Sequence, residues 1–205
     1  MHQEHKISIL GCGWLGLSLA MSLVAKGWRV KGSTTTHAKF DMLASNKIDP
    51  YLVQLAGNSP IEPRFFDSDV LFINIPPSLK KQSAEAYLNQ MRGLVKQVER
   101  SPIKQVIFIS STSVYPEKNQ EITDTDGIDN QSALYQSEQL FRERVEFKTT
   151  IIRFAGLIGP GRNPARFFAG KTNIANGKAP VNLIHLDDCI GIIQILLEQQ
   201  NFGST

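Results

Sequence analysis

The segment that most constrains this chain is residues 11–16, Gly-Cys-Gly-Trp-Leu-Gly, which directly follows an apolar run at 7–10. An apolar run of that length is typical of a buried strand, and the leucines spaced four residues apart after the loop predict a helix. Gly27 favours a left-handed helix end, and 28–31 then returns as a second strand. The sequence therefore predicts a strand–helix–strand unit with G-x-G-x-x-G at its first turn.

Each glycine of this loop has a physical role in binding a dinucleotide. Gly11 allows a tight turn, Gly13 leaves room for a pyrophosphate against the backbone, and Gly16 lets the helix pack close to the strand. The helix N-terminus adds free N–H groups and a partial positive charge. The alternative is a glycine-rich turn that binds nothing. We expect the pyrophosphate of a cofactor to lie over Gly11, Cys12, Gly13, Trp14, Leu15 and Gly16.

The segment after the second strand bears on the choice between NAD and NADP. NAD-binding proteins usually carry an acid about 20 residues past the glycines, where it binds the ribose hydroxyls. Here the next acid is Asp41, inside the following helix, whereas His37 and Lys39 would tolerate a 2′-phosphate. This favours NADP over NAD; the alternative is a polar loop whose hydroxyls cap the next helix. The residues expected beside the ribose are Ser33, Thr34 and Thr35.

Short apolar strands alternate with amphipathic helices along the rest of the chain, which predicts an α/β fold with a doubly wound parallel sheet of about six to seven strands. The strands are expected at 7–10, 28–31, 51–55, 69–75, 105–109, 149–154 and 182–186. The later helices are expected at 83–98, 133–146 and 187–200. Val145 is expected to face inward, and Asp187 to cap the last helix rather than to bind a metal. We expect one continuous domain, 1–205.

Three shaped or polar loops follow predicted strands at the edge where ligands bind in open α/β sheets. Two prolines after the strand at 69–75 fix a rigid loop. Four hydroxyl residues at 110–113 would each cost about 1–3 kcal/mol if buried without partners. They either form a local turn or face a substrate. The loop at 156–162 places Arg162 where it could bind an anion. The residues expected to line this edge are Asn74, Ile75, Pro76, Pro77, Ser110, Ser111, Thr112, Ser113, Phe154, Gly156 and Arg162.

Composition excludes several classes of function. The chain has 205 residues, of which 41% are hydrophobic and 20% charged, and its net charge is +3. This small, dispersed charge favours neither a nucleic acid nor a membrane as partner. Cys12 and Cys189 lie far apart and predict neither a disulfide framework nor a metal cluster, so we expect a reducing, cytoplasmic compartment.

Four motifs together resemble the extended short-chain dehydrogenase/reductase superfamily, in its NAD-dependent epimerase/dehydratase family. They are GCGWLG, ISSTSVYP, IRFAGLIGPGR and NLIHLDD. The glycine spacing and the two prolines at 76–77 are similar to its atypical bacterial branch. The resemblance implies a Rossmann fold, NAD or NADP as cofactor, and a nucleotide sugar or related alcohol as small-molecule substrate. It implies a catalytic role for Ser111, cofactor contacts by Ser110, Phe154 and Gly156, and substrate contacts by Thr112, Ser113 and Arg162.

The chain departs from the family in two ways. The family's Tyr-x-x-x-Lys pair is absent, because none of the four tyrosines is followed by lysine at the fourth position; Tyr135 lies nearest to the expected place. The chain also stops where family members begin a further substrate-binding portion, so 156–205 is expected to be an incomplete substrate side, and an open edge there favours a homodimer. Two readings stay open: an enzyme that transfers hydride, or a catalytically inactive NAD(P)-binding sensor or interaction module.

Overall fold

The computed structural model describes residues 5–55, 61–78, 82–116, 121–123, 127–167, 169–173, 180–199 and 202–203. Its centre is a parallel six-stranded sheet in the order β3-β2-β1-β4-β5-β6. The strands are β1 (Lys6–Leu10), β2 (Arg29–Thr34), β3 (Ile48–Leu52), β4 (Val70–Ile73), β5 (Gln105–Ser111) and β6 (Lys148–Phe154). A second, two-stranded parallel sheet joins β7 (Gly156–Ile158) to β8 (Leu183–His185).

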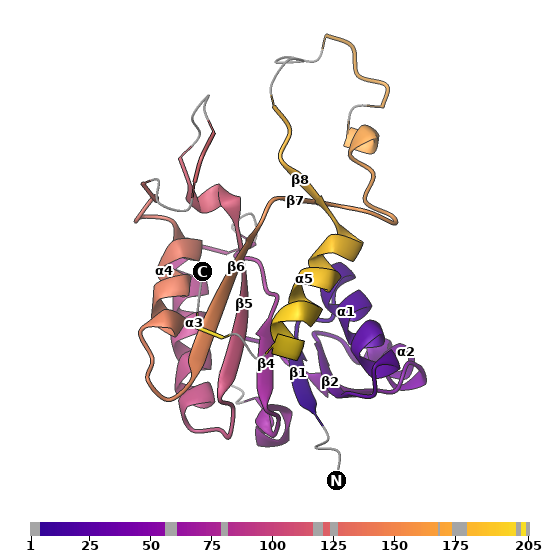
Figure 1. The fold of residues 1–205 in the computed structure, drawn as a ribbon, viewed down its shortest axis with the longest axis vertical. Helices are drawn as coiled ribbons and strands as arrows, with labels where there is room; N and C mark the ends of the chain where they lie inside the picture. The colour runs from indigo at the N-terminus through magenta and orange to yellow at the C-terminus, as the bar shows by residue number, and fades with distance from the viewer. Residues whose placement is uncertain are drawn as a thin grey trace.

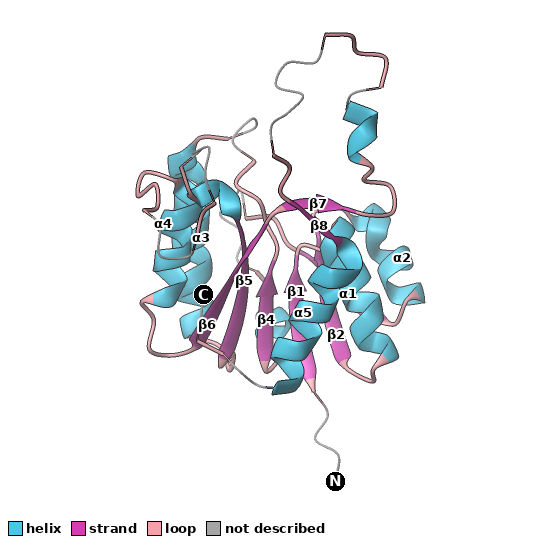
Figure 2. Ribbon diagram, turned by 45° about the horizontal axis from the view of Figure 1, so that its top comes forward, coloured by secondary structure: helices cyan, strands magenta, loops and turns pink. Residues whose placement is uncertain are grey.

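Helices cover both faces of the large sheet (Figures 1 and 2). They are α1 (Trp14–Ala25), α2 (Phe40–Ser45), α3 (Ala84–Glu99), α4 (Ala133–Arg142) and α5 (Leu186–Gln199). One core joins α3 and α4 to alternate sheet residues such as Leu71 and Phe108. The other joins α1, α2 and α5 to the intervening residues, such as Phe72 and Ile107. This alternation is why β4, Val-Leu-Phe-Ile, is buried on both faces.

The first strand–helix–strand unit forms as its sequence predicts. Helix α1 buries Leu15, Leu19 and Leu23 against the sheet. Its last residue is Ala25, and Gly27, whose φ of +85° is left-handed, turns the chain away from the helix. There the N–H of Trp28 donates to the carbonyl of Leu23. That bond satisfies a carbonyl that the helix end would otherwise leave unpaired.

Helices α3 and α4 show where helix periodicity works and where it fails. Ser83 caps α3 by accepting a hydrogen bond from the N–H of Ala86, so the helix itself begins one residue after the expected start. Helix α4, however, ends at Arg142, and the expectation that Val145 faces inward is wrong, because Val145 is 92% exposed. The chain must turn there to enter β6, and Phe147 fills the core instead.

Several strand boundaries also differ from the sequence-based expectation. β2 continues to Thr34 and β5 to Ser111. β3 begins at Ile48 and contains Pro50, which an edge strand tolerates because one side of its ladder is unpaired. Helix α5 begins at Leu186, so Asp187 is not its cap; the Nδ1 atom of His185 accepts the N–H of Asp187 instead.

The strand order 3-2-1-4-5-6 with helices on both faces is that of a Rossmann fold. The direction of winding reverses between β1 and β4, and ligands of such sheets bind in the crevice outside the carboxyl ends at this switch point. Figure 1 shows β7 and β8 beyond these carboxyl ends, over the same side of the molecule. Among the described residues, no helix combines the length and the apolar composition that a membrane crossing needs.

Candidate functional site

The glycine loop lies at the switch point, in contact with the loop that follows β4. Gly11 has a φ of +103°, and a Cβ there would approach the carbonyl oxygen of Asn74 to 2.7 Å. The Asn74 side chain in turn donates to the carbonyl of Gly11. A Cβ at Gly16 would lie 2.2 Å from that same Gly11 oxygen. Close packing of backbone on backbone therefore demands glycine at both positions.

Gly13 is different, because nothing in the described protein demands a glycine there. A Cβ at Gly13 would meet no atom within 4 Å, and its φ of −82° suits any residue. Gly13 is exposed at the start of α1, where no side chain caps the helix. The space above it thus borders free N–H groups and the positive end of the helix dipole. This open cradle fits a pyrophosphate.

The end of β2 supports the glycine loop. The Ser33 hydroxyl accepts the N–H of Gly11 at 2.8 Å, and the Ser33 carbonyl accepts the N–H of Cys12 at 2.9 Å. Thr34 is 8% exposed and its hydroxyl contacts the backbone of Thr36. Thr35 is exposed. The Ser33 side chain therefore supports the glycine loop, that of Thr34 supports the turn after β2, and Thr35 is the one of the three that faces solvent.

Cys12 points into the protein. It is 5% exposed, and a Cβ at Gly32 would lie 2.7 Å from its sulfur. Burial raises the pKa of the Cys12 thiol to about 12, although the Ser33 backbone and the positive charge of Lys39 oppose the shift. Lys39 is exposed in the 3₁₀ turn His37–Lys39, which follows β2.

The loop after β4 is held by Tyr87 of α3 and by Gln82, which precedes that helix. The hydroxyl of Tyr87 donates to the carbonyl of Ile75 at 3.2 Å, and the Gln82 amide donates to the carbonyl of Pro77 at 2.8 Å. Ile75 also packs against the core, while Pro76 is exposed. Asn74, Ile75, Pro76 and Pro77 thus form a fixed wall beside the glycine loop.

The four hydroxyl residues at 110–113 lie at the end of β5 and in the 3₁₀ turn Thr112–Val114 that follows it. The buried Ser110 donates to a carboxylate oxygen of Glu138. The Ser111 oxygen accepts the N–H of Ser113 at 3.1 Å, and no described group accepts the proton of Ser111. Thr112 accepts a long hydrogen bond from Asn182, of 3.5 Å, and Ser113 is exposed. Ser111 thus keeps a proton that it can donate to a ligand.

Sequence reasoning missed a polar cluster of Glu138, Arg153 and Tyr115 at the carboxyl ends of β5 and β6. The Glu138 side chain is 0% exposed and that of Arg153 is 7% exposed. Arg153 donates to both oxygens of Glu138, at 3.0 and 2.6 Å, and its third nitrogen donates to the Tyr115 hydroxyl at 2.7 Å. The hydrogen bonds to Glu138 hold the pKa of Arg153 above its usual range. An arginine within an apolar strand was the available signal, because a buried cation needs a partner.

The remaining catalytic candidate, Tyr135, lies in the first turn of α4, with its ring against the core. The fourth residue after it is Gln139, in place of a lysine. The Gln139 amide nitrogen is buried and has no hydrogen-bond partner among the described residues. Phe154 is 4% exposed and lies inside the core, so a ligand could reach only its backbone. Gly156 packs against Leu183 of β8.

Arg162 lies close to the glycine loop. The Trp14 indole N–H donates to the carbonyl of Pro160 at 2.7 Å. The guanidinium carbon of Arg162 lies 4.7 Å from the centre of the Trp14 ring. A segment from beyond β7 thus closes against the first residue of α1.

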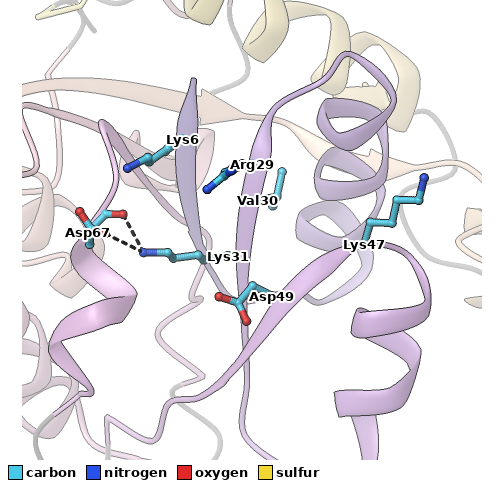
Figure 3. A pocket seen from close by; sticks show the side chains of 7 residues that line it. All are labelled: Lys6, Arg29, Val30, Lys31, Lys47, Asp49 and Asp67. Atoms are coloured by element: carbon cyan, nitrogen blue, oxygen red, sulfur yellow. Dashed lines mark hydrogen bonds and ion pairs between the residues drawn. The ribbon is translucent and has the colours of Figure 1, made fainter. Parts of the chain in front are cut away.

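A cavity of about 230 Å³ lies at the opposite, amino edge of the sheet (Figure 3). Lys6, Arg29 and Lys47 line it near the starts of β1, β2 and β3. Lys31 points at Asp67 and donates to the Asp67 carbonyl at 2.6 Å, while Lys47 points away. Burial lowers the pKa of Lys31. This cavity lies at the edge of the sheet opposite the switch point. Lys31 connects β2 to the chain before β4.

The chain matches known proteins over most of its length. The model of the NAD binding domain of 6-phosphogluconate dehydrogenase matches residues 6–128. Protein YeeZ of Escherichia coli K12 is 39% identical over 206 residues, covering 97% of this chain and 75% of its own length.

Two solved structures share the fold. A UDP-glucuronic acid 4-epimerase from Bacillus cereus, in complex with UDP-glucuronic acid and NAD, superposes with a TM-score of 0.77 at 19% identity, over 97% of this chain and 76% of its own. A putative NAD-dependent epimerase/dehydratase from Methylobacillus flagellatus superposes with a TM-score of 0.69 at 24% identity, over 97% of this chain and 71% of its own. At these identities the likeness shows the fold alone.

Proposed function

The chain belongs to the family of NAD-binding domains typified by that of 6-phosphogluconate dehydrogenase, and we propose that it is an NAD(P)-dependent oxidoreductase or epimerase of the extended short-chain dehydrogenase/reductase superfamily. The observation that carries this proposal is the open cradle over Gly13, at the switch point of a Rossmann sheet. The substrate we propose is a nucleotide sugar or a related alcohol or carbonyl compound. Support comes from fold neighbours whose structures hold UDP-sugars and NAD.

The preferred cofactor in this proposal is NADP. β2 ends at Thr34 without an acid to bind the ribose hydroxyls. Thr35 is exposed, and so are His37 and Lys39 in the 3₁₀ turn that follows it. A cation at that place would favour a 2′-phosphate, so the affinity for NADP is expected to exceed that for NAD.

In the proposed chemistry a bound nicotinamide would provide hydride transfer, and a protein side chain would give the accompanying proton when a carbonyl is reduced and take it when an alcohol is oxidised. When a carbonyl is reduced, its carbon gains the hydride and its oxygen gains a proton. We assign that proton to the Tyr115 hydroxyl, whose oxygen already accepts from Arg153 and would keep this bond as a phenolate. No described group accepts the Tyr115 proton. Ser111, in the same turn, would hold the substrate oxygen.

This assignment replaces the missing tyrosine–lysine pair by Tyr115 and Arg153. In the short-chain dehydrogenase/reductase superfamily a lysine four residues after the tyrosine assists it. Here the fourth residue after Tyr135 is Gln139, which carries no charge. That difference also supports a second candidate function, a sensor that binds the cofactor without turnover. A homodimer and a cytoplasmic location stay predictions.

Turnover with a panel of nucleotide sugars and small carbonyls, followed by nicotinamide absorbance, separates the two candidates. Tyr115→Phe removes the hydroxyl and keeps the ring, and is expected to lower kcat by about 100-fold or more while the cofactor Kd is unchanged. Tyr135→Phe is the matched control and is expected to retain activity. Equal losses in both variants would refute the assignment of Tyr115. A wild-type protein that binds NADP(H) but turns over nothing in the panel would favour the sensor.

A further inference from the structure

Arg162 follows a tight turn that is built to hold it in one place. The N–H of Arg162 donates to the carbonyl of Gly159 at 2.9 Å, and the N–H of Gly159 donates back to the carbonyl of Arg162 at 3.3 Å. Gly159 and Gly161 have φ values of +147° and +75°, which disfavour other residues. The path of the backbone at Arg162 is therefore specified by the sequence of this loop.

The same turn contacts the glycine loop through Trp14. A Cβ on Gly159 would lie 3.2 Å from the Trp14 ring, so glycine is needed for the close approach. The indole N–H donates to the Pro160 carbonyl, on the residue between the two glycines. Trp14 itself is the first residue of α1, directly after Gly13. Its backbone N–H is among the free groups at the helix start.

The guanidinium of Arg162 is available to a ligand. It rests on the Trp14 ring, which is 4.7 Å from its central carbon, and the side chain is exposed. Arg162 forms no ion pair with any described carboxylate. A guanidinium stacked on a ring by one face keeps its five N–H donors at the edge, in a geometry that matches phosphate oxygens. The helix dipole adds positive potential at the same place.

We propose that Arg162 is a ligand of the cofactor's pyrophosphate, rather than of the substrate, and that the Trp14–Pro160 hydrogen bond positions it there. The segment after β7 would then close the dinucleotide site on the side away from the sheet. This inference rests on the proposed function, since it requires that a dinucleotide occupies the cradle over Gly13. It adds a side-chain cation to a site that otherwise binds phosphate through backbone groups.

The test is a calorimetric titration of the full chain with ADP-ribose, which carries the pyrophosphate, and with adenosine, which has no phosphate. Arg162→Gln is expected to raise the Kd for ADP-ribose about tenfold and to leave that for adenosine unchanged. Arg166→Gln is the matched control, because Arg166 is also exposed, in the 3₁₀ turn Pro164–Phe167, and its loss changes the net charge equally. Trp14→Phe keeps a ring but removes the hydrogen bond to Pro160, and is expected to give a smaller loss.

Each outcome decides one point. An unchanged ADP-ribose Kd in Arg162→Gln would overturn the inference and leave the proposed function standing. Equal weakening in Arg162→Gln and Arg166→Gln would also overturn it, because the effect would then be one of net charge alone. A wild-type chain that binds neither ADP-ribose, NAD nor NADP would overturn the proposed function and this inference together.

Discussion

Replacing Glu138 by glutamine should strongly destabilise the protein, because it would leave a buried cation without its counter-charge. Arg153 is 7% exposed and gives two of its hydrogen bonds to Glu138, which is 0% exposed. Removing one partner of such a pair costs about 3–5 kcal/mol. The hydrogen bond from Arg153 to Tyr115 does not offset this, because a neutral phenol adds no negative charge.

Urea denaturation followed by circular dichroism measures the effect. With an m value of about 2 kcal/mol/M, the midpoint for Glu138→Gln should fall by about 1.5–2.5 M. The double variant Glu138→Leu with Arg153→Met removes both charges and should recover most of the loss. A single variant within about 1 kcal/mol of wild type, or a double variant no more stable than the single one, would refute this account of the cluster.

Two further predictions follow from packing and from burial. Gly16→Ala places a Cβ 2.2 Å from the Gly11 carbonyl oxygen and should lower the stability by about 2–3 kcal/mol. Gly93→Ala, in α3, places a Cβ that meets nothing within 4 Å and should raise the stability by about 0.5–1 kcal/mol. Urea midpoints that fall in both variants or in neither would contradict this. Burial raises the pKa of Cys12 from 9.0 to about 12, so between these pH values the unfolded chain binds fewer protons than the folded one. The free energy of unfolding should therefore fall as pH rises through this window, and it should fall less in Cys12→Ala.

Much of the fold could be predicted from the sequence because its signals are local. The β1–α1–β2 unit depends on an apolar run, spaced leucines and glycines that act on their own turn. Helix α3 depends on one apolar face, whose residues Tyr87, Met91, Leu94 and Val98 are buried. Such features need no knowledge of what packs against them, and the structure confirms them.

The errors arose where distant parts of the chain decide the outcome. Pro50 argues against a strand, yet it lies in β3 because β3 is at the sheet edge. Val145 continues an apolar spacing but is exposed, because the chain turns back toward β6. The cluster joins Tyr115 to Arg153 across 38 positions of sequence, and no local pattern predicts that contact. Ser33 accepts the N–H of Gly11 from 22 residues away, which no local pattern predicts either, and its place beside a ribose stays a prediction.

The most direct test of the dinucleotide site is a calorimetric titration of the wild type and of Gly13→Val with NAD and NADP. Since a Cβ at Gly13 meets no described atom within 4 Å, the variant should fold, with a loss of about 1 kcal/mol at most because valine is a poorer N-cap than glycine. Its side chain would fill the cradle, so the wild type should show saturable binding at one site and the variant none. A Gly13→Val protein that bound either dinucleotide with the wild-type affinity would contradict the assignment of the site.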